Sequence, residues 1–163
     1  MKDSISLIGM AGAGKSSIAN ELSSIMDFKI IDSDGLIEQK QGSSLQKILD
    51  DQGYKALQEI EEKILLSVDF NEIILSTGGS AIYSVKAMEY LMQNSKVFFL
   101  EVPFKTILER VDNFSKRGFI KPLNQTIKDA FEERKYLYKK YSHHIIDNSS
   151  SISSGVSKIL ELY

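Results

Sequence analysis

The sequence predicts an α/β fold in which helices cover both faces of a parallel β-sheet. Three observations predict it. Short apolar runs of strand type recur along the chain, segments with apolar residues at helical spacing separate them, and a glycine-rich loop joins the first run to the first helix. Strands that alternate with helices form parallel sheets buried on both faces. With 42% hydrophobic and 26% charged residues, the 163 residues suit one globular domain, residues 1–163.

The glycine-rich loop lies between the first predicted strand, residues 4–8, and the first predicted helix, which begins near Ser17. Residues 9–16 read G-x-x-x-x-G-K-S, the pattern of a phosphate-binding loop in the strand, loop and helix order that it requires. Backbone N–H groups must approach a polyphosphate closely, and glycine permits this. Lys15 is expected to reach the β- and γ-phosphates and Ser16 to bind Mg²⁺. The predicted nucleotide-binding residues are Gly9, Gly12, Ala13, Gly14, Lys15, Ser16 and Ser17.

The second strand is predicted at residues 28–31 and is followed by Asp-Ser-Asp at residues 32–34. Carboxylates at the carboxyl end of a strand lie where open α/β sheets bind ligands. The same residues can also simply cap the next helix. Helical periodicity begins at Leu36, breaks at Gly42, and resumes in two segments that Gly53 separates.

The third strand, residues 72–76, precedes Thr-Gly-Gly-Ser at residues 77–80. Two adjacent glycines after a strand indicate close approach of a ligand or of another backbone. Further strands are predicted at residues 97–100 and 144–147, and further helices at residues 85–92, 103–111, 126–141 and 156–163. The basic segment of residues 113–123 lacks apolar periodicity, and we predict that it forms a mobile lid.

Charge and composition exclude several classes of function. The net charge is -2, the sequence pI is about 5.7, and Lys and Arg are scattered, which argues against nucleic acid as the main partner. The chain has no cysteine, so disulfides and thiolate metal sites are excluded. We find no charged-then-apolar leader and no apolar run of transmembrane length, and therefore expect a cytoplasmic protein without membrane contact.

Several motifs in this order resemble the shikimate kinase family of small P-loop kinases. They are the loop at residues 9–16, the runs at 32–34 and 77–79, Arg117, and Glu133-Arg134 before Leu137-Tyr138. The resemblance covers nearly the whole chain. It implies a nucleoside-monophosphate-kinase-like fold with five parallel strands in the order 2-3-1-4-5, a lid at about 113–123 and substrate-binding helices at about 35–66. It also implies a monomer that uses ATP and Mg²⁺ to phosphorylate a hydroxyl of shikimate.

The resemblance implies a role for three catalytic residues. Asp34 matches the family aspartate that contacts the acceptor hydroxyl, and Lys15 the lysine of the phosphate loop. Arg117 matches the lid arginine that closes over the γ-phosphate. Asp32 matches an aspartate that organises Mg²⁺, together with Ser16. Phosphoryl transfer depends on such positioning and charge neutralisation more than on covalent chemistry.

The resemblance also implies binding residues. Arg110 matches a residue near the adenine, Arg134 an arginine that holds the substrate carboxylate, and Glu61 a glutamate that supports substrate-site arginines. Gly78 and Gly79 match the glycines that border the substrate.

Three departures from the family pattern fall on the acceptor side. Gln58 stands where the family has a second carboxylate-binding arginine, and Ser80 replaces the third consecutive glycine. The lid reads Arg117-Gly118-Phe119 where the family usually has Arg-Pro-Leu, although Lys121-Pro122-Leu123 follows. Alternatives therefore stay open: a kinase of another small hydroxylated acid or amino acid, homoserine being one candidate, or a nucleotide-binding regulator that has lost catalysis.

Overall fold

A computed structural model describes residues 3–111 and 124–163 of the chain. Within them, five strands pair in parallel in the order β2-β3-β1-β4-β5, as the family resemblance implied. They are β1 (Ile5–Ile8), β2 (Lys29–Asp32), β3 (Ile73–Ser76), β4 (Lys96–Glu101) and β5 (His144–Asp147). Strands β1 and β3 are buried along their whole length because helices cover both faces of the sheet.

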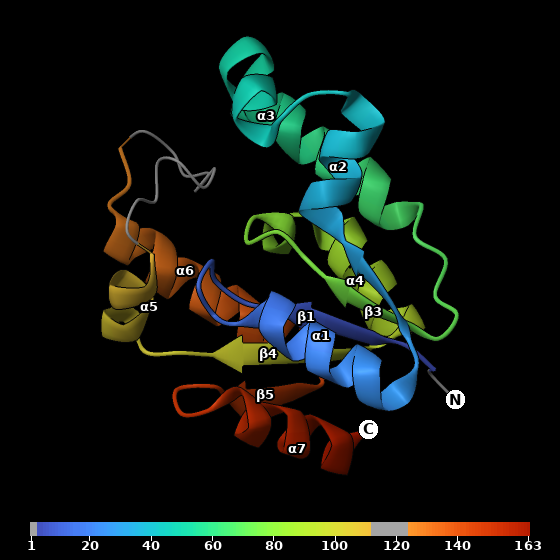
Figure 1. Cartoon of the computed structure of the whole chain (residues 1–163). Coiled ribbons are helices and arrows are strands. Elements are labelled where there is room, and N and C mark those ends of the chain that lie inside the picture. The colour runs from blue at the N-terminus through green and yellow to red at the C-terminus, as the bar shows by residue number, and fades with distance from the viewer. Residues whose placement is uncertain (1–2, 112–123) are drawn as a thin grey trace.

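The helices form the outer layers. α1 and α7 pack together on one face of the sheet, and α4 and α6 lie on the other (Figure 1). Their bounds are α1 (Lys15–Met26), α2 (Ser33–Gln41), α3 (Leu45–Leu66), α4 (Val85–Asn94), α5 (Phe104–Arg110), α6 (Ile127–Lys140) and α7 (Ile152–Leu162). A short 3-10 helix, η1 (Ala81–Tyr83), was not predicted. None of the helices in the described part of the chain is long and apolar enough to cross a membrane.

Two apolar clusters hold these elements together. The larger one surrounds the sheet and is built on buried side chains of all its central strands and of the helices against them. The smaller one joins α2 to α3, through Ile37, Ile48, Leu57 and Ile64. In Figure 1 these two helices project above the carboxyl ends of the strands. They therefore overhang the edge of the sheet to which the glycine-rich loop belongs.

Local signals explain most helix ends. Ser44 caps α3 by accepting a hydrogen bond from the backbone of Lys47, and Thr126 and Asp129 form a reciprocal capping box on α6. The predicted break at Gly53 is confirmed: Gly53 takes the non-helical angles φ 82° and ψ 173°, so α3 consists of two helical segments that meet at a kink.

Candidate active site

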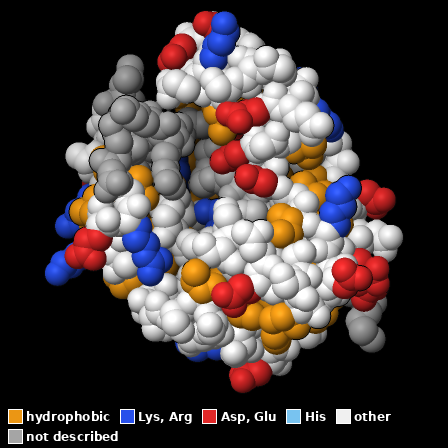
Figure 2. Space-filling view, in the orientation of Figure 1, with side chains coloured by type: hydrophobic (Ala, Val, Ile, Leu, Met, Phe, Trp, Pro, Cys, Tyr) orange, Lys and Arg blue, Asp and Glu red, His pale blue; other side chains and the backbone are white. Residues whose placement is uncertain are grey.

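A cavity of about 730 Å³ lies at the carboxyl edge of the sheet, beneath α2 and α3. Parallel strands bring all their carboxyl ends to this edge, so segments distant in sequence meet there. Figure 2 shows the surface hollowed between the part formed by α2 and α3 and the sheet below it. The lining includes residues of the glycine-rich loop, of the 32–34 and 77–80 segments, of α3, and Arg110, Arg134 and Asn148.

The glycine-rich loop takes the conformation that its glycines allow. Gly12 and Gly14 have φ values of 80° and 92°, in the left-handed region that other residues avoid. A Cβ at Gly12 would also lie 2.7 Å from a side-chain carbon of Val111. Gly14 then caps α1, whose N-terminus opens into the cavity. The loop therefore presents backbone and a helix N-terminus to any anion in the cavity.

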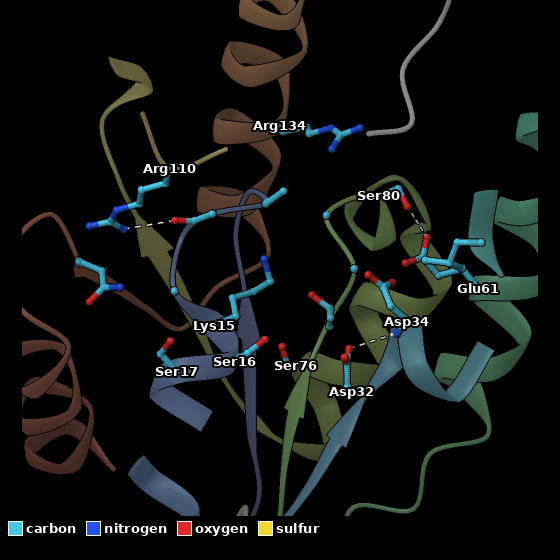
Figure 3. Close-up of a pocket in the computed structure, with 18 of the residues that line it drawn as sticks. Lys15, Ser16, Ser17, Asp32, Asp34, Glu61, Ser76, Ser80, Arg110 and Arg134 are labelled. Carbon is cyan, nitrogen blue, oxygen red and sulfur yellow. Dashed lines mark hydrogen bonds between the residues drawn. The ribbon is translucent and has the colours of Figure 1, made fainter. Parts of the chain in front are cut away.

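Lys15 folds back over this loop. Its Nζ donates to the carbonyl oxygens of Gly9 at 2.7 Å and Met10 at 2.8 Å. Burial lowers the pKa of Lys15 to about 8, while the nearby carboxylates of Asp34 and Asp32 act in the opposite direction. Figure 3 shows Lys15 and Asp34 pointing into the same space from the loop and from α2. The cation thus faces the carboxylates across the cavity.

Asp32 and Asp34 have different surroundings although they are two residues apart. Asp32 ends β2, caps α2 by accepting from the backbone N–H of Asp34 at 3.2 Å, and is exposed. Asp34 is turned into the cavity, and burial together with the charge of Asp32 raises its pKa to about 6, against the pull of Lys15. Capping thus accounts for Asp32 alone and leaves the Asp34 carboxylate available to a ligand.

The 77–80 segment packs tightly against these carboxylates. The backbone N–H of Gly78 donates to Ser33 Oγ at 2.8 Å, which fixes the segment to the end of β2. A Cβ at Gly78 would lie 2.4 Å from Asp34 Oδ1 and 2.7 Å from Glu61 Oε1. Only glycine fits at this position, so Gly78 is explained by close approach of two acidic side chains.

Ser80 and Glu61 join the same segment to α3. Ser80 Oγ donates to Glu61 Oε2 at 2.6 Å, and both residues are buried. Glu61 Oε1 has no hydrogen-bond partner within the described residues. Burial raises the pKa of Glu61 to about 7, and the charge of Asp34 adds to the rise, while the Ser80 hydrogen bond and Arg134 oppose it. Figure 3 shows the Glu61 and Asp34 carboxyl groups side by side.

Arg134 comes from α6 and is only 2% exposed. Its guanidinium lies over the ring of Tyr83, 5.3 Å from the centroid, and its Nε donates to the Tyr83 hydroxyl at 3.4 Å. Tyr138, one turn further along α6, donates to the carbonyl of Gly79 at 2.8 Å. These contacts fix a buried cation at the cavity, beside the 77–80 segment.

Arg110 lies beside the glycine-rich loop. Its Nη1 donates to the carbonyl of Gly12 at 3.2 Å, so α5 is tied to the glycine-rich loop. Ser17 also lines the cavity, on the first turn of α1. Most of the predicted nucleotide-binding residues line the cavity: Gly12, Gly14, Lys15, Ser16, Ser17 and Arg110. Gly9 and Ala13 lie behind them in the glycine-rich loop.

On the acceptor side, one predicted residue within the described part of the chain does not line the large cavity. Gln58 donates to the Tyr54 hydroxyl at 2.8 Å and borders a smaller cavity of about 190 Å³, which Glu61 and Ser80 separate from the large one. Arg117 and the expected lid lie outside the described residues.

Sequence reasoning missed some lining residues. Asn148 follows β5 and reaches the carbonyl of Ala13, 135 positions away. Its place directly after a strand was the available signal, because polar residues there face the ligand edge. Ala11 and Thr77 lie within the quoted motifs but were not named as site residues. The other missed residues are apolar or small, and no motif marks them: Ile37, Leu45, Leu57, Ser76, Ser150 and Ile152.

The donor set fits Mg²⁺ and not a metal held by protein alone. No group of three or more His, Cys, Asp or Glu that could hold a metal ion occurs among residues 3–111 and 124–163. Ser16 and Asp32 offer a hydroxyl and an exposed carboxylate on the same side of the cavity (Figure 3). Mg²⁺ commonly keeps several waters and takes one or two carboxylates together with substrate phosphates.

Comparisons with known proteins agree with this geometry. The family model for shikimate kinase matches residues 11–163. A shikimate kinase of Sulfurihydrogenibium sp. (strain YO3AOP1) is 32% identical over 157 residues, covering 96% of this chain and 95% of that protein. Two solved structures cover 98% of this chain: shikimate kinase from Acinetobacter baumannii in complex with shikimate (TM-score 0.83, 28% identity, 91% of that chain) and shikimate kinase from Aquifex aeolicus vf5 (0.82, 26%, 94%). They confirm the predicted kinase fold.

Proposed function

This chain belongs to the shikimate kinase family, and we propose that it transfers the γ-phosphate of ATP to a hydroxyl group of shikimate. The observation that carries the proposal is the convergence of Lys15, Asp34 and Arg134 on one cavity, which the glycine-rich loop also lines. A phosphate-binding loop beside a carboxylate and a buried arginine suits a reaction between a nucleotide and a small hydroxylated acid.

Residues of the loop bind the donor nucleotide. The backbone of residues 9–14 surrounds the phosphates, and Lys15 exchanges its two carbonyl acceptors for phosphate oxygens, which are stronger acceptors because they carry charge. Ser17 and Arg110 complete this nucleotide site, with Arg110 beside the base. The family resemblance adds Arg117 as a further cation over the transferring group.

Ser16 and Asp32 are the residues that would hold Mg²⁺, with Asp32 acting directly or through a water. When bound, Mg²⁺ neutralises charge on the phosphate oxygens. Asp32 already has an exposed carboxylate fixed at a helix N-terminus, so its orientation is set before the metal arrives.

Asp34 orients the attacking hydroxyl and accepts its proton as the new P–O bond forms. Arg134 binds the carboxylate of the acceptor from α6, and Gly78, Gly79 and Ser80 border the acceptor. We propose Gln58 as a further acceptor-side residue; its amide donates to the Tyr54 hydroxyl. The helices at about 35–66 form the outer wall of the acceptor end.

The relatives reported above are shikimate kinases, so shikimate is preferred over homoserine or another hydroxylated acid. The test is an ATP-consumption assay on purified protein with shikimate, homoserine, or no acceptor. Turnover that depends on shikimate supports the proposal. Turnover with homoserine alone overturns the acceptor, and nucleotide binding without turnover on either acceptor overturns the catalytic role in favour of a regulatory one.

We also propose that the enzyme acts as a monomer in the cytoplasm and without nucleic acid. The net charge of -2 argues against nucleic acid as a partner, and the family resemblance supports the monomer. Light scattering of the purified protein at assay concentration gives its mass, which is 18.3 kDa for one chain.

A further inference from the structure

Asn148 holds the glycine-rich loop from the far end of the chain. It follows β5 and is 3% exposed, and its Nδ2 donates to the carbonyl oxygen of Ala13 at 2.7 Å. Its own backbone N–H donates to the carbonyl of Glu101 at 3.0 Å, so the residue is fixed by the strand before its side chain reaches the loop. A buried hydrogen bond between such distant segments orients both of them.

The contacts of the Asn148 side chain leave little room for another position. A Cβ at Gly14 would lie 2.8 Å from Nδ2, and a Cβ at Gly155 on α7 would lie 2.6 Å from Oδ1. Oδ1 has no hydrogen-bond partner among the residues described. A buried unpaired acceptor is unfavourable, so packing and the single bond from Nδ2 determine the placement of this amide.

The bond to Ala13 fixes one peptide plane of the loop. The described residues contain no cis peptide bond, so the Ala13 carbonyl and the Gly14 N–H point in opposite directions. Because Nδ2 holds the carbonyl toward β5 and α7, the Gly14 N–H is directed away from them. Gly14 has φ 92°, and glycine tolerates rotation of this peptide more readily than other residues do. Without the amide, the carbonyl could turn toward the phosphates and repel them.

We propose that Asn148 is a positioning residue for nucleotide binding, which holds the Ala13–Gly14 peptide with its N–H available to the phosphates of the nucleotide. This inference rests on the proposed nucleotide site and extends it to the segment after β5. The side chain acts through the loop and needs no contact with the acceptor. Ser150 and Ile152 line the same cavity, so the segment also forms part of its nucleotide-side wall.

The test is Asn148→Asp, which keeps the shape of the side chain and removes the Nδ2 donor. We expect the Kd for Mg·ADP, measured by calorimetry without acceptor, to rise about tenfold to a hundredfold. The KM for ATP should rise in parallel, while the KM for shikimate at saturating ATP stays within about twofold. Asn94→Asp is the matched control, because Asn94 also donates from Nδ2 to a backbone carbonyl, that of Tyr90, on α4. Asn94→Asp should leave the Kd for Mg·ADP and both KM values unchanged.

Unchanged Mg·ADP affinity in folded Asn148→Asp overturns the inference, as does an equal rise in both KM values. If this variant does not fold, Asn148→Ala decides by the same measurements, since it introduces no negative charge beside the carbonyl. Gly155→Ala tests the placement independently: its methyl group should displace Asn148 and weaken Mg·ADP binding although Gly155 does not line the cavity. ADP binding needs no acceptor, so failure of shikimate turnover alone leaves this inference standing.

Discussion

At the residue scale, Asp34 shows how a short run of sequence serves structure and chemistry separately. Asp32 caps α2, so the helix end is satisfied without Asp34. A Cβ at position 78 would collide with the Asp34 carboxylate, so Gly78 leaves the room that this side chain needs. The side chain is therefore held beside Lys15 by packing and charge, with its carboxylate directed into the cavity.

Asp34→Asn should lower kcat by about a hundredfold to ten-thousandfold, because the amide keeps the packing but cannot accept the proton of the hydroxyl. Nucleotide affinity should stay within a few fold, since the proposed contacts of Asp34 are with the acceptor. Steady-state kinetics and Mg·ADP calorimetry measure the two effects. Asp69→Asn, at an exposed position between α3 and β3, is the control. Loss of nucleotide binding in Asp34→Asn would show that the carboxylate has a different role.

Gln58→Arg should lower the KM for shikimate and leave the KM for ATP unchanged. The guanidinium adds a charge that can pair with the acceptor carboxylate, whereas the native amide is occupied with Tyr54. Gln52→Arg, exposed on the same helix, controls for a general effect of added positive charge. A KM for shikimate that does not fall would show that Arg134 and its neighbours already satisfy the carboxylate.

At the element scale, the sequence predicts regular segments better than it predicts their partners. Strand β5 and helix α6 follow directly from local patterns, and these predictions are confirmed. The break at Gly53 was also predicted, and the non-helical backbone of this residue, which kinks α3, confirms it. The contact of Asn148 with Ala13 joins residues 135 positions apart, and nothing local to either residue encodes it.

The sequence also predicts one part of the candidate site better than the other. A contiguous motif predicts the phosphate end, since eight adjacent residues carry its chemistry. The acceptor end is assembled from β2, α3, the 77–80 segment and α6, so its residues are recognisable only by family resemblance. Gln58 illustrates the limit: its register on α3 was clear, but its hydrogen bond to Tyr54 and its place at the smaller cavity depend on packing.

The junction of α3 with the 77–80 segment makes a prediction about pH. Glu61 has a pKa of about 7 in the folded chain, above the ordinary value of 4.5, so the folded state favours its protonated form. The resulting stabilisation is fully present below about pH 4.5 and is lost as the pH rises through about 7. Its size is on the order of 3 kcal/mol.

Glu61→Gln should remove this component, because the amide does not titrate. Between pH 5 and pH 8, the free energy of unfolding of the native chain should therefore fall relative to that of the variant. Urea unfolding at several pH values measures the difference, with Glu89→Gln, exposed on α4, as the control. Parallel pH profiles for the native chain and Glu61→Gln would mean that the buried carboxyl stays ionised in the folded state.

At the scale of the whole molecule, the parallel topology places every cavity-lining segment at one edge of the sheet. The segments that follow β1, β2, β3 and β5 each contribute lining residues, and α5, α6 and the α3 helix close the space around them. Each segment is anchored in the main apolar cluster through its strand. A nucleotide that contacts several of them at once therefore binds the folded chain and not the unfolded one, and so should stabilise the entire fold.

Mg·ADP at a hundred times its Kd should raise the free energy of unfolding by about 2.7 kcal/mol. For a chain of this length the melting temperature should then rise by about 5 to 10 °C. Lys15→Met should lose most of this shift, because its ammonium group no longer neutralises the phosphates. Lys63→Met, exposed on α3, should keep the full shift in the same thermal scan. An equal shift in both variants would contradict the role of Lys15, since stabilisation would then arise from binding outside the phosphate loop.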